Sequence, residues 1–198
     1  FSSTRSTAFP YQQEVYTVPV AGGQETRLRL YEGKEAYFAP KGDAVAFVRG
    51  PGSWFRKGYR GSANDDVWVS GVDGSAPQRV TSFDGQDTSP MWSPDGRRLY
   101  YVTENGSPTG YANVVAHDLT ADRGPKPLTT HRDDAVRRAR VSRNGEWIVY
   151  ECGADLWVVG TKGTPPRKLA IEVHADDKAN TETATTFTRD ATDYALSP

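Results

Sequence analysis

Short apolar segments separated by polar turns recur along the whole chain. After successive turns come AVAFVRG (44–50), RLYYVTE (98–104) and WIVYECG (147–153), which are rich in β-branched and aromatic residues. They lack the spacing of an amphipathic helix and therefore favour strands. A second apolar segment follows each, a third comes after a turn rich in Gly, Pro and Ser, and a fourth precedes the next turn. The pattern predicts four short antiparallel strands per unit and almost no helix.

The units repeat with a period near 50 residues. Equivalent turn positions at Pro40, Pro94, Arg143 and Pro198 lie 54, 49 and 55 residues apart. Four-stranded units with such a period are typical of β-propellers, in which each unit is a blade that packs face to face with its neighbours around an axis. We therefore predict an all-β fold made of propeller blades.

The period also sets the expected blade boundaries within a single domain. It predicts a partial blade over residues 1–34, blades over about 35–86, 87–135 and 136–175, and the start of another blade over 176–198. About four blades make an incomplete ring, and both ends resemble cuts through a longer repeat array. Because propellers normally close their ring, the exposed blade face of such a piece predicts self-association.

Tryptophans mark the expected packing between blades. Trp68, Trp92 and Trp157 fall on predicted strands, where an indole buries a large apolar area. We expect each to be a wedge between two blades rather than a ligand platform. We also expect Phe38, Trp92 and Val141 to lie on the innermost strands.

Composition and charge narrow the classes of partner. Lys and Arg number 24 against 25 Asp and Glu, so no net field attracts nucleic acid or an anionic membrane surface. No long apolar run is present to span a membrane, and 36% hydrophobic residues suffice for one core. The single cysteine, Cys152, lies in an apolar strand, which predicts a buried, inert thiol. Both a cytoplasmic and a periplasmic location fit these features.

Catalytic and metal-binding motifs are absent from the sequence. It contains no G-x-S-x-G elbow, no glycine-rich phosphate loop and no H-E-x-x-H, and its three histidines are scattered. The carboxylate pairs at 65–66, 133–134 and 176–177 lack the spacing of a calcium loop, and adjacent strand residues point to opposite faces. We interpret these pairs as solvated turn residues. We assign no catalytic residue, no metal ligand and no cofactor.

One connection is unusually long. Residues 50–64 join the second and third strands of the second blade, whereas Gly153 and Ala154 make the same connection in the fourth. Long loops in compact repeats are usually functional or disordered. Aromatic side chains interleaved with cations suit peptide carboxylates and carbonyls. The candidate binding residues are Trp54, Phe55, Arg56, Lys57, Tyr59 and Arg60.

A structural interpretation of this insertion remains beside the binding one. Trp54 and Phe55 would fold back as a plug over the blade edge, and the arginines would pair with Asp65 or Asp66. In either case we expect residues 54–60 to project from the propeller face near residues 84–87 and 131–134.

Two longer stretches carry a family resemblance. The repeat WSPDGRRLYYVT (92–103) resembles that of TolB, of prolyl oligopeptidase relatives and of tricorn-type proteases. Residues 54–68, with WFRKGYRG and NDDVW, resemble the insertion in the amino-terminal propeller of tricorn-type proteases. Residues 168–177, continuing to TFTRDATDYALSP (186–198), resemble the segment that leads toward the next propeller.

The resemblance implies a noncatalytic β-propeller portion of a tricorn-like serine peptidase, which gates or guides short peptides toward catalytic domains not in this chain. Its partners would be peptides and the remaining domains of the longer protein. The alternative is a TolB-like scaffold propeller that mediates protein–protein interaction. Neither implies nucleic-acid or membrane binding.

Overall fold

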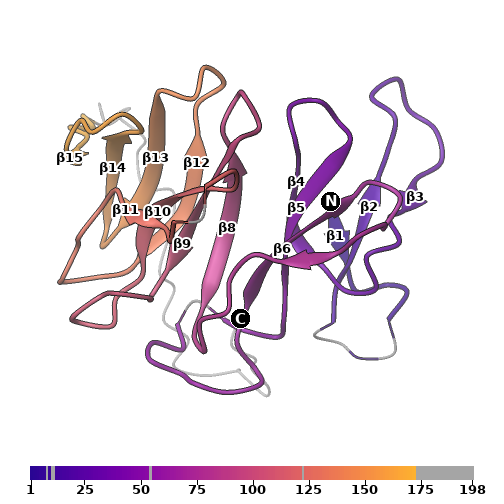
Figure 1. The fold of residues 1–198 in the computed structure, drawn as a ribbon, viewed down its shortest axis with the longest axis horizontal. Coiled ribbons are helices and arrows are strands. Elements are labelled where there is room, and N and C mark those ends of the chain that lie inside the picture. The colour runs from indigo at the N-terminus through magenta and orange to yellow at the C-terminus, as the bar shows by residue number, and fades with distance from the viewer. Residues whose placement is uncertain (8, 10–11, 54, 122, 173–198) are drawn as a thin grey trace, which may run out of the picture.

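The computed structural model describes residues 1–7, 9, 12–53, 55–121 and 123–172. Four antiparallel sheets follow one another along the chain and lie face to face (Figure 1). The described residues contain strands and turns and no helix, which confirms the predicted all-β propeller fold. The predicted start of a further blade, over 176–198, lies outside the described residues.

The first sheet has three strands and each of the other three has four, in sequence order from one edge to the other. The strands of the first two sheets are β1 (Ser2–Ser3), β2 (Glu14–Thr17) and β3 (Thr26–Arg27), then β4 (Lys34–Phe38), β5 (Ala44–Arg49), β6 (Asp66–Gly71) and β7 (Gln78–Arg79). The third sheet comprises β8 (Asp87–Trp92), β9 (Arg98–Thr103), β10 (Asn113–Asp118) and β11 (Lys126–Pro127). The fourth comprises β12 (Val136–Val141), β13 (Trp147–Cys152), β14 (Asp155–Gly160) and β15 (Arg167–Lys168).

The first strands of the three four-stranded sheets are the innermost. Strand β8 contacts both β4 and β12, so these edge strands of successive sheets lie side by side. They end in Phe38, Trp92 and Val141, as predicted. Each also contains a β-bulge, at which Glu35, Ser89 and Arg138 have positive φ values of 48°, 52° and 50°. A bulge kinks its strand and increases the local twist, so the three sheets bend alike toward the axis.

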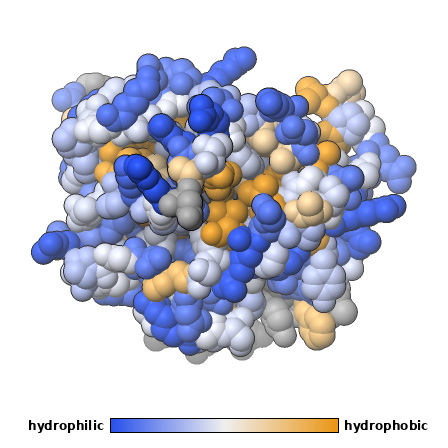
Figure 2. All heavy atoms as spheres, in the orientation of Figure 1, coloured by the Kyte–Doolittle hydropathy of each residue, from blue (hydrophilic) through white to orange (hydrophobic). Residues whose placement is uncertain are grey.

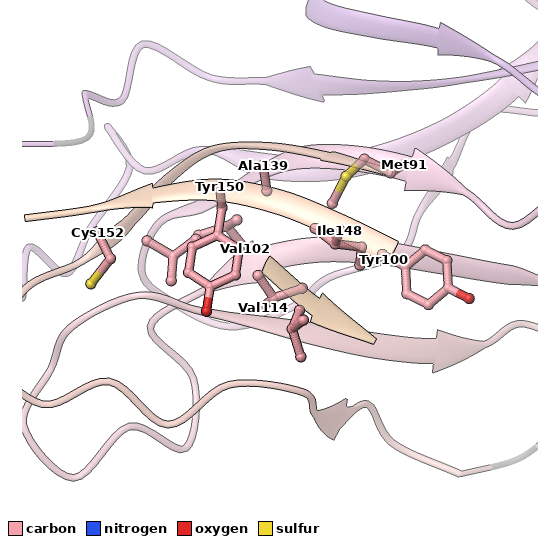
Figure 3. Packing of buried hydrophobic residues seen from close by; sticks show 10 residues of the cluster. Met91, Tyr100, Val102, Val114, Ala139, Ile148, Tyr150 and Cys152 are labelled. Carbon is pink, nitrogen blue, oxygen red and sulfur yellow. The ribbon is translucent and has the colours of Figure 1, made fainter. Parts of the chain in front are cut away.

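Apolar residues fill the space between neighbouring sheets. We call the packing of the second sheet on the third the first seam, and that of the third on the fourth the second seam. The first seam contains a cluster of buried side chains from β5, β6, β9 and β10. The second contains a larger cluster from β8, β9, β10, β12, β13 and β14, in which Tyr150 and Ile148 face Val102, Val114 and Met91 (Figure 3). Free Cys152 is buried at its edge, as predicted.

The three tryptophans are wedges between sheets, as predicted. Trp68 packs on the cluster around Val45 and Phe47 between the first and second sheets, Trp92 on the first seam and Trp157 on the second. Hydrophilic residues cover most of the face shown in Figure 2, and its apolar residues gather near the centre. Among the described residues, none forms a helix that is long and apolar enough to cross a membrane.

Candidate functional site

The insertion emerges between β5 and β6 at one end of the second sheet. Strand β5 ends at Arg49 and β6 begins at Asp66, whereas β13 and β14 are joined by Gly153 and Ala154 alone. In Figure 1 the insertion projects at the bottom of the view, opposite the turns that join β4 to β5, β8 to β9 and β12 to β13. It therefore extends one face of the propeller, as the sequence predicted.

Asp65 fixes the base of the insertion. Its side chain is only 3% exposed, and Oδ2 lies 2.9 Å from Nζ of Lys34. The Gly52 amide donates to Asp65 Oδ1 over 2.8 Å, and Lys34 also donates to the Gly52 carbonyl. A side chain at Gly52 would overlap Gln86 Oε1 and the Asp65 carboxyl. Burial raises the pKa of Asp65 to about 6, although Lys34 acts in the opposite direction.

The middle of the insertion is bound to the third sheet through Glu104. The Gly58 amide donates to Glu104 Oε1 over 3.1 Å, and Nη1 of Arg60 lies 2.8 Å from Oε2. The Glu104 side chain is 4% exposed and that of Arg60 is 42% exposed, so the carboxylate is shielded from water while the guanidinium remains partly solvated. Next to it, Nζ of Lys57 lies 3.5 Å from the ring centroid of Tyr111. The insertion thus bridges the first seam and is a folded part of the domain.

The outer part of the insertion leaves an aromatic side chain in solvent. Phe55 is 69% exposed. Arg56 stacks over the ring of Tyr59 at 3.8 Å from the centroid, which orients the guanidinium. The Gly61 amide donates to Asp84 over 3.1 Å and holds the end of the insertion on the neighbouring turn.

A cavity of about 630 Å³ opens beside the base of the insertion. Gly52, Ser53 and Asp65 form one side, and the bulged parts of β4, β8 and β12 form the rest. Across it, Glu35 Oε2 accepts from the Ser89 amide over 2.8 Å and links two innermost strands. The other charged residues that line this cavity are Lys34, Arg137, Arg138, Arg140 and Glu151. Such mixed charge can bind both the amino and the carboxylate groups of an extended peptide.

Residues 1–165 match the family model for the tricorn protease N-terminal beta propeller domain. The chain belongs to this family. A tricorn protease homolog of Saccharolobus solfataricus is 27% identical over 176 residues, which are 87% of this chain and 15% of that protein. A putative tricorn protease homolog 2 of Streptomyces coelicolor is 28% identical over 126 residues, 62% of this chain and 9% of that protein. This tricorn-family propeller thus corresponds to only a small part of the length of these curated relatives.

Solved structures show the same fold. The crystal structure of the tricorn protease matches with a TM-score of 0.72 and 20% identity, over 89% of this chain and 16% of that one. TolB from Acinetobacter baumannii matches with a TM-score of 0.65 and 16% identity, over 85% of this chain and 39% of that one. TolB therefore shares the propeller fold of this chain.

The structure brings most of the predicted site residues together on the insertion, but with different partners from those expected. Trp54 lies outside the described residues. The expectation that the arginines pair with Asp65 or Asp66 is wrong for Arg60, which pairs with Glu104. Asp65 pairs instead with Lys34, and Asp66 with Arg79 at 2.8 Å.

The interpretation of all the carboxylate pairs as solvated turn residues is also wrong for Asp65. It is buried because it lies under the insertion, where Lys34 and an amide offset part of its desolvation. Asp134 Oδ1 accepts from the Ala135 amide and from Arg137, and residues 176–177 lie outside the described residues. Among the described residues, no three acidic, His or Cys side chains cluster in a way that could hold a metal ion.

Sequence reasoning missed Asp87, at the first residue of β8. This carboxylate is fully buried in the first seam, and neither oxygen makes a hydrogen bond of good geometry with a described residue. Burial raises its pKa to about 7, and the neighbouring hydroxyls of Thr103 and Thr81 offset only part of that effect. A signal was present: the equivalent positions in the neighbouring units are Gly33 and Val136.

His131 lies in a structural network of the second seam. His131 Nε2 is 2.9 Å from the Tyr150 hydroxyl, and its ring packs edge-on against Trp157. Desolvation lowers the pKa of both His131 and His117. The buried thiol of Cys152 donates to the Asp134 carbonyl. These contacts stabilise the second seam.

Proposed function

We propose that this propeller is a noncatalytic portion of a tricorn-like serine peptidase, and that it guides or filters short peptides toward catalytic domains elsewhere in the longer protein. The observation that carries the proposal is the insertion, which is folded across the first seam beside a cavity of about 630 Å³ of mixed charge. Membership of the tricorn propeller family supports the peptidase context.

The contacts of the insertion divide its residues into two roles. Arg60 and Gly58 anchor it on Glu104. Arg56 and Lys57 lie on aromatic rings, beside exposed Phe55. We therefore assign peptide contact to Phe55, Arg56 and Lys57, with Tyr59 in the same surface, and positioning of that surface to Arg60.

The test uses the longer peptidase with a library of short peptides. Replacing Arg56 and Lys57 together by Ala should lower peptide binding or processing by about tenfold or more, because each charge-assisted hydrogen bond contributes about 1.5–3 kcal/mol. The melting temperature should change little, since exposed charges contribute little to folding. Arg132→Ala, which removes one exposed cation, is the control for a general effect of lost positive charge.

Arg60→Ala separates the two roles. It should weaken peptide handling and also increase amide hydrogen exchange over residues 55–63, whereas the Arg56 and Lys57 variant should leave exchange unchanged. Unaltered peptide handling in the Arg56 and Lys57 variant would overturn the peptide role. Retained binding of a protein partner in that variant would then favour a scaffold function.

A further inference from the structure

A second charged cavity lies at the end of the sheets opposite the insertion. It has a volume of about 570 Å³ and lies in the second seam, where β9 begins, β10 ends and β14 ends. The insertion instead joins the end of β5 to the start of β6, so the two sites occupy opposite faces of the propeller. The charged residues that line this second cavity are Arg98, Arg123, Lys126, Lys162 and Asp118.

Among the four cations, Arg98 interacts electrostatically with Asp118 and Asp95, but none makes a close contact with a described carboxylate. No hydrogen bond or ion pair joins the side chains of Arg98, Arg123, Lys126 or Lys162 to another described residue, and all four residues are exposed. Asp118 is the one carboxylate among the described lining residues. Its Oδ1 accepts from the Thr120 amide and hydroxyl over 2.9 and 2.7 Å. These hydrogen bonds are the main cause of its lowered pKa, so Asp118 remains ionised beside the cations.

The equivalent hollow of the first seam serves as an internal comparison. It has a volume of about 420 Å³, and its one described cation, Arg79, is paired with Asp66. By strand register, Lys126 occupies the place of Gln78, because each lies opposite the same position of the preceding strand. Lys162 occupies the place of Thr120, two residues after the third strand of its sheet. The fold therefore does not need these cations.

We propose that this cavity binds a small polyanion that carries two or more phosphate groups. Arg and Lys donors bind phosphate oxygens strongly, and among the described lining residues four of them outnumber the one carboxylate, Asp118. The volume lies in the range of small-molecule sites. Ala116, Ala121 and Leu128 supply an apolar wall for the uncharged part of the ligand.

A small ligand fits these observations better than nucleic acid. The cations surround one hollow instead of following a stripe, and the net charge of the chain is −1. Extended nucleic acids are bound by clustered positive charge along a face or groove.

Inorganic pyrophosphate is the probe for the first test, titrated calorimetrically into the purified chain at constant ionic strength. We expect saturable binding of one pyrophosphate per chain. Replacing Lys126 by Gln and Lys162 by Thr, the residues of the first seam, should weaken binding by about tenfold or more. The control variant, Lys41→Gln with Arg132→Gln, loses the same charge elsewhere and should bind like the wild type. Absence of saturable binding, or an equal loss in both variants, would overturn the proposal.

Gly124→Glu gives a second, independent test. Gly124 lines the cavity, its φ lies outside the left-handed region, and an added Cβ would meet no atom within 4 Å. The variant should therefore fold normally, with an unchanged melting temperature, and should bind pyrophosphate more weakly because it adds a carboxylate at the rim. Undiminished affinity in this variant would contradict the assigned position of the ligand.

Discussion

The two seams have the same backbone architecture but differ in what they bury at the end near the insertion. At three positions there the second seam has apolar residues, whereas the first buries two carboxylic acids and one amide. By repeat spacing, the three matched pairs are Asp65 and Ala112, Gln86 and Ala135, and Asp87 and Val136. Apolar packing therefore sets the geometry of both seams, and the polar residues of the first seam are an addition at its edge.

The neighbouring hydrogen-bond networks differ in the same way. In the third sheet, Asn113 Oδ1 accepts from the Thr129 hydroxyl over 2.9 Å and from the His131 amide over 2.7 Å. At the equivalent place in the second sheet, Asp66 pairs with Arg79, and Asp87 lies close by without a hydrogen bond of good geometry to a described residue. A satisfied buried network costs little, whereas an unpaired buried carboxylate opposes folding.

The largest effect on the free energy of unfolding is expected for substitutions in the two apolar clusters. Leu99 of the first seam and Ile148 of the second are both 0% exposed. Replacing either by Ala should lower the free energy of unfolding by about 2–5 kcal/mol, because lost transfer energy and a cavity add together. We expect the greater loss for Ile148→Ala, whose cluster is larger. Denaturant unfolding measures both, and a greater loss for Leu99→Ala would reverse the ranking of the seams.

The second prediction concerns Asp87 and pH. Its pKa is about 7 in the folded chain against an ordinary value of 3.8, so the native state binds this proton more tightly than the unfolded state. Its effect on stability is therefore most favourable at low pH and is lost as pH rises from about 4 to about 7. Asp87→Val, which copies Val136, should increase the free energy of unfolding by about 2–4 kcal/mol at pH 8. The gain should be smaller at pH 5.

Asp87→Asn is the control for volume, since it removes the charge and keeps the shape. It should flatten the pH dependence of the melting temperature between pH 5 and 8 as Asp87→Val does. Because the pKa of Asp65 is also raised, a weaker pH dependence of the melting temperature should remain in both variants. A gain in stability that is independent of pH would show that Asp87 is not a buried ionisable group in this range.

The contrast between the seams also shows what the sequence could and could not predict. Strands, turns and the wedge position of Trp92 follow from local patterns that recur with the repeat. The burial of Asp65 does not, because its partner Lys34 lies 31 residues earlier, on β4, which is separated from β6 by β5 in the same sheet. Arg60 likewise meets Glu104 across the first seam, at a sequence separation of 44 residues. Local pattern gives the side on which a residue projects, but not what covers it.

The smallest effect on the free energy of unfolding is expected for substitutions of the charged residues at two equivalent bulges. Glu35 accepts from the Ser89 amide and hydroxyl over 2.8 and 3.1 Å, and so joins two sheets across the first seam. Among the described residues, Arg138 pairs within its own sheet, with Glu151 at 2.9 Å, and its side chain is 79% exposed. Glu35→Gln should lower the free energy of unfolding by about 1 kcal/mol, since it weakens a charge-assisted bond. Arg138→Gln should change it by at most about 0.5 kcal/mol, because solvent screens the pair.

Glutamine suits both positions as a replacement, because it keeps a long side chain at a backbone that is already left-handed and adds no new conformational cost. The difference between the two variants therefore reports the bond across the seam and not the bulge itself. Replicate thermal unfolding measurements resolve a difference of this size in the free energy of unfolding. An equal, near-zero effect at Glu35 and Arg138 would mean that the first seam is held by its apolar cluster alone. Glu35 would then be only a charge in the lining of the cavity beside the insertion.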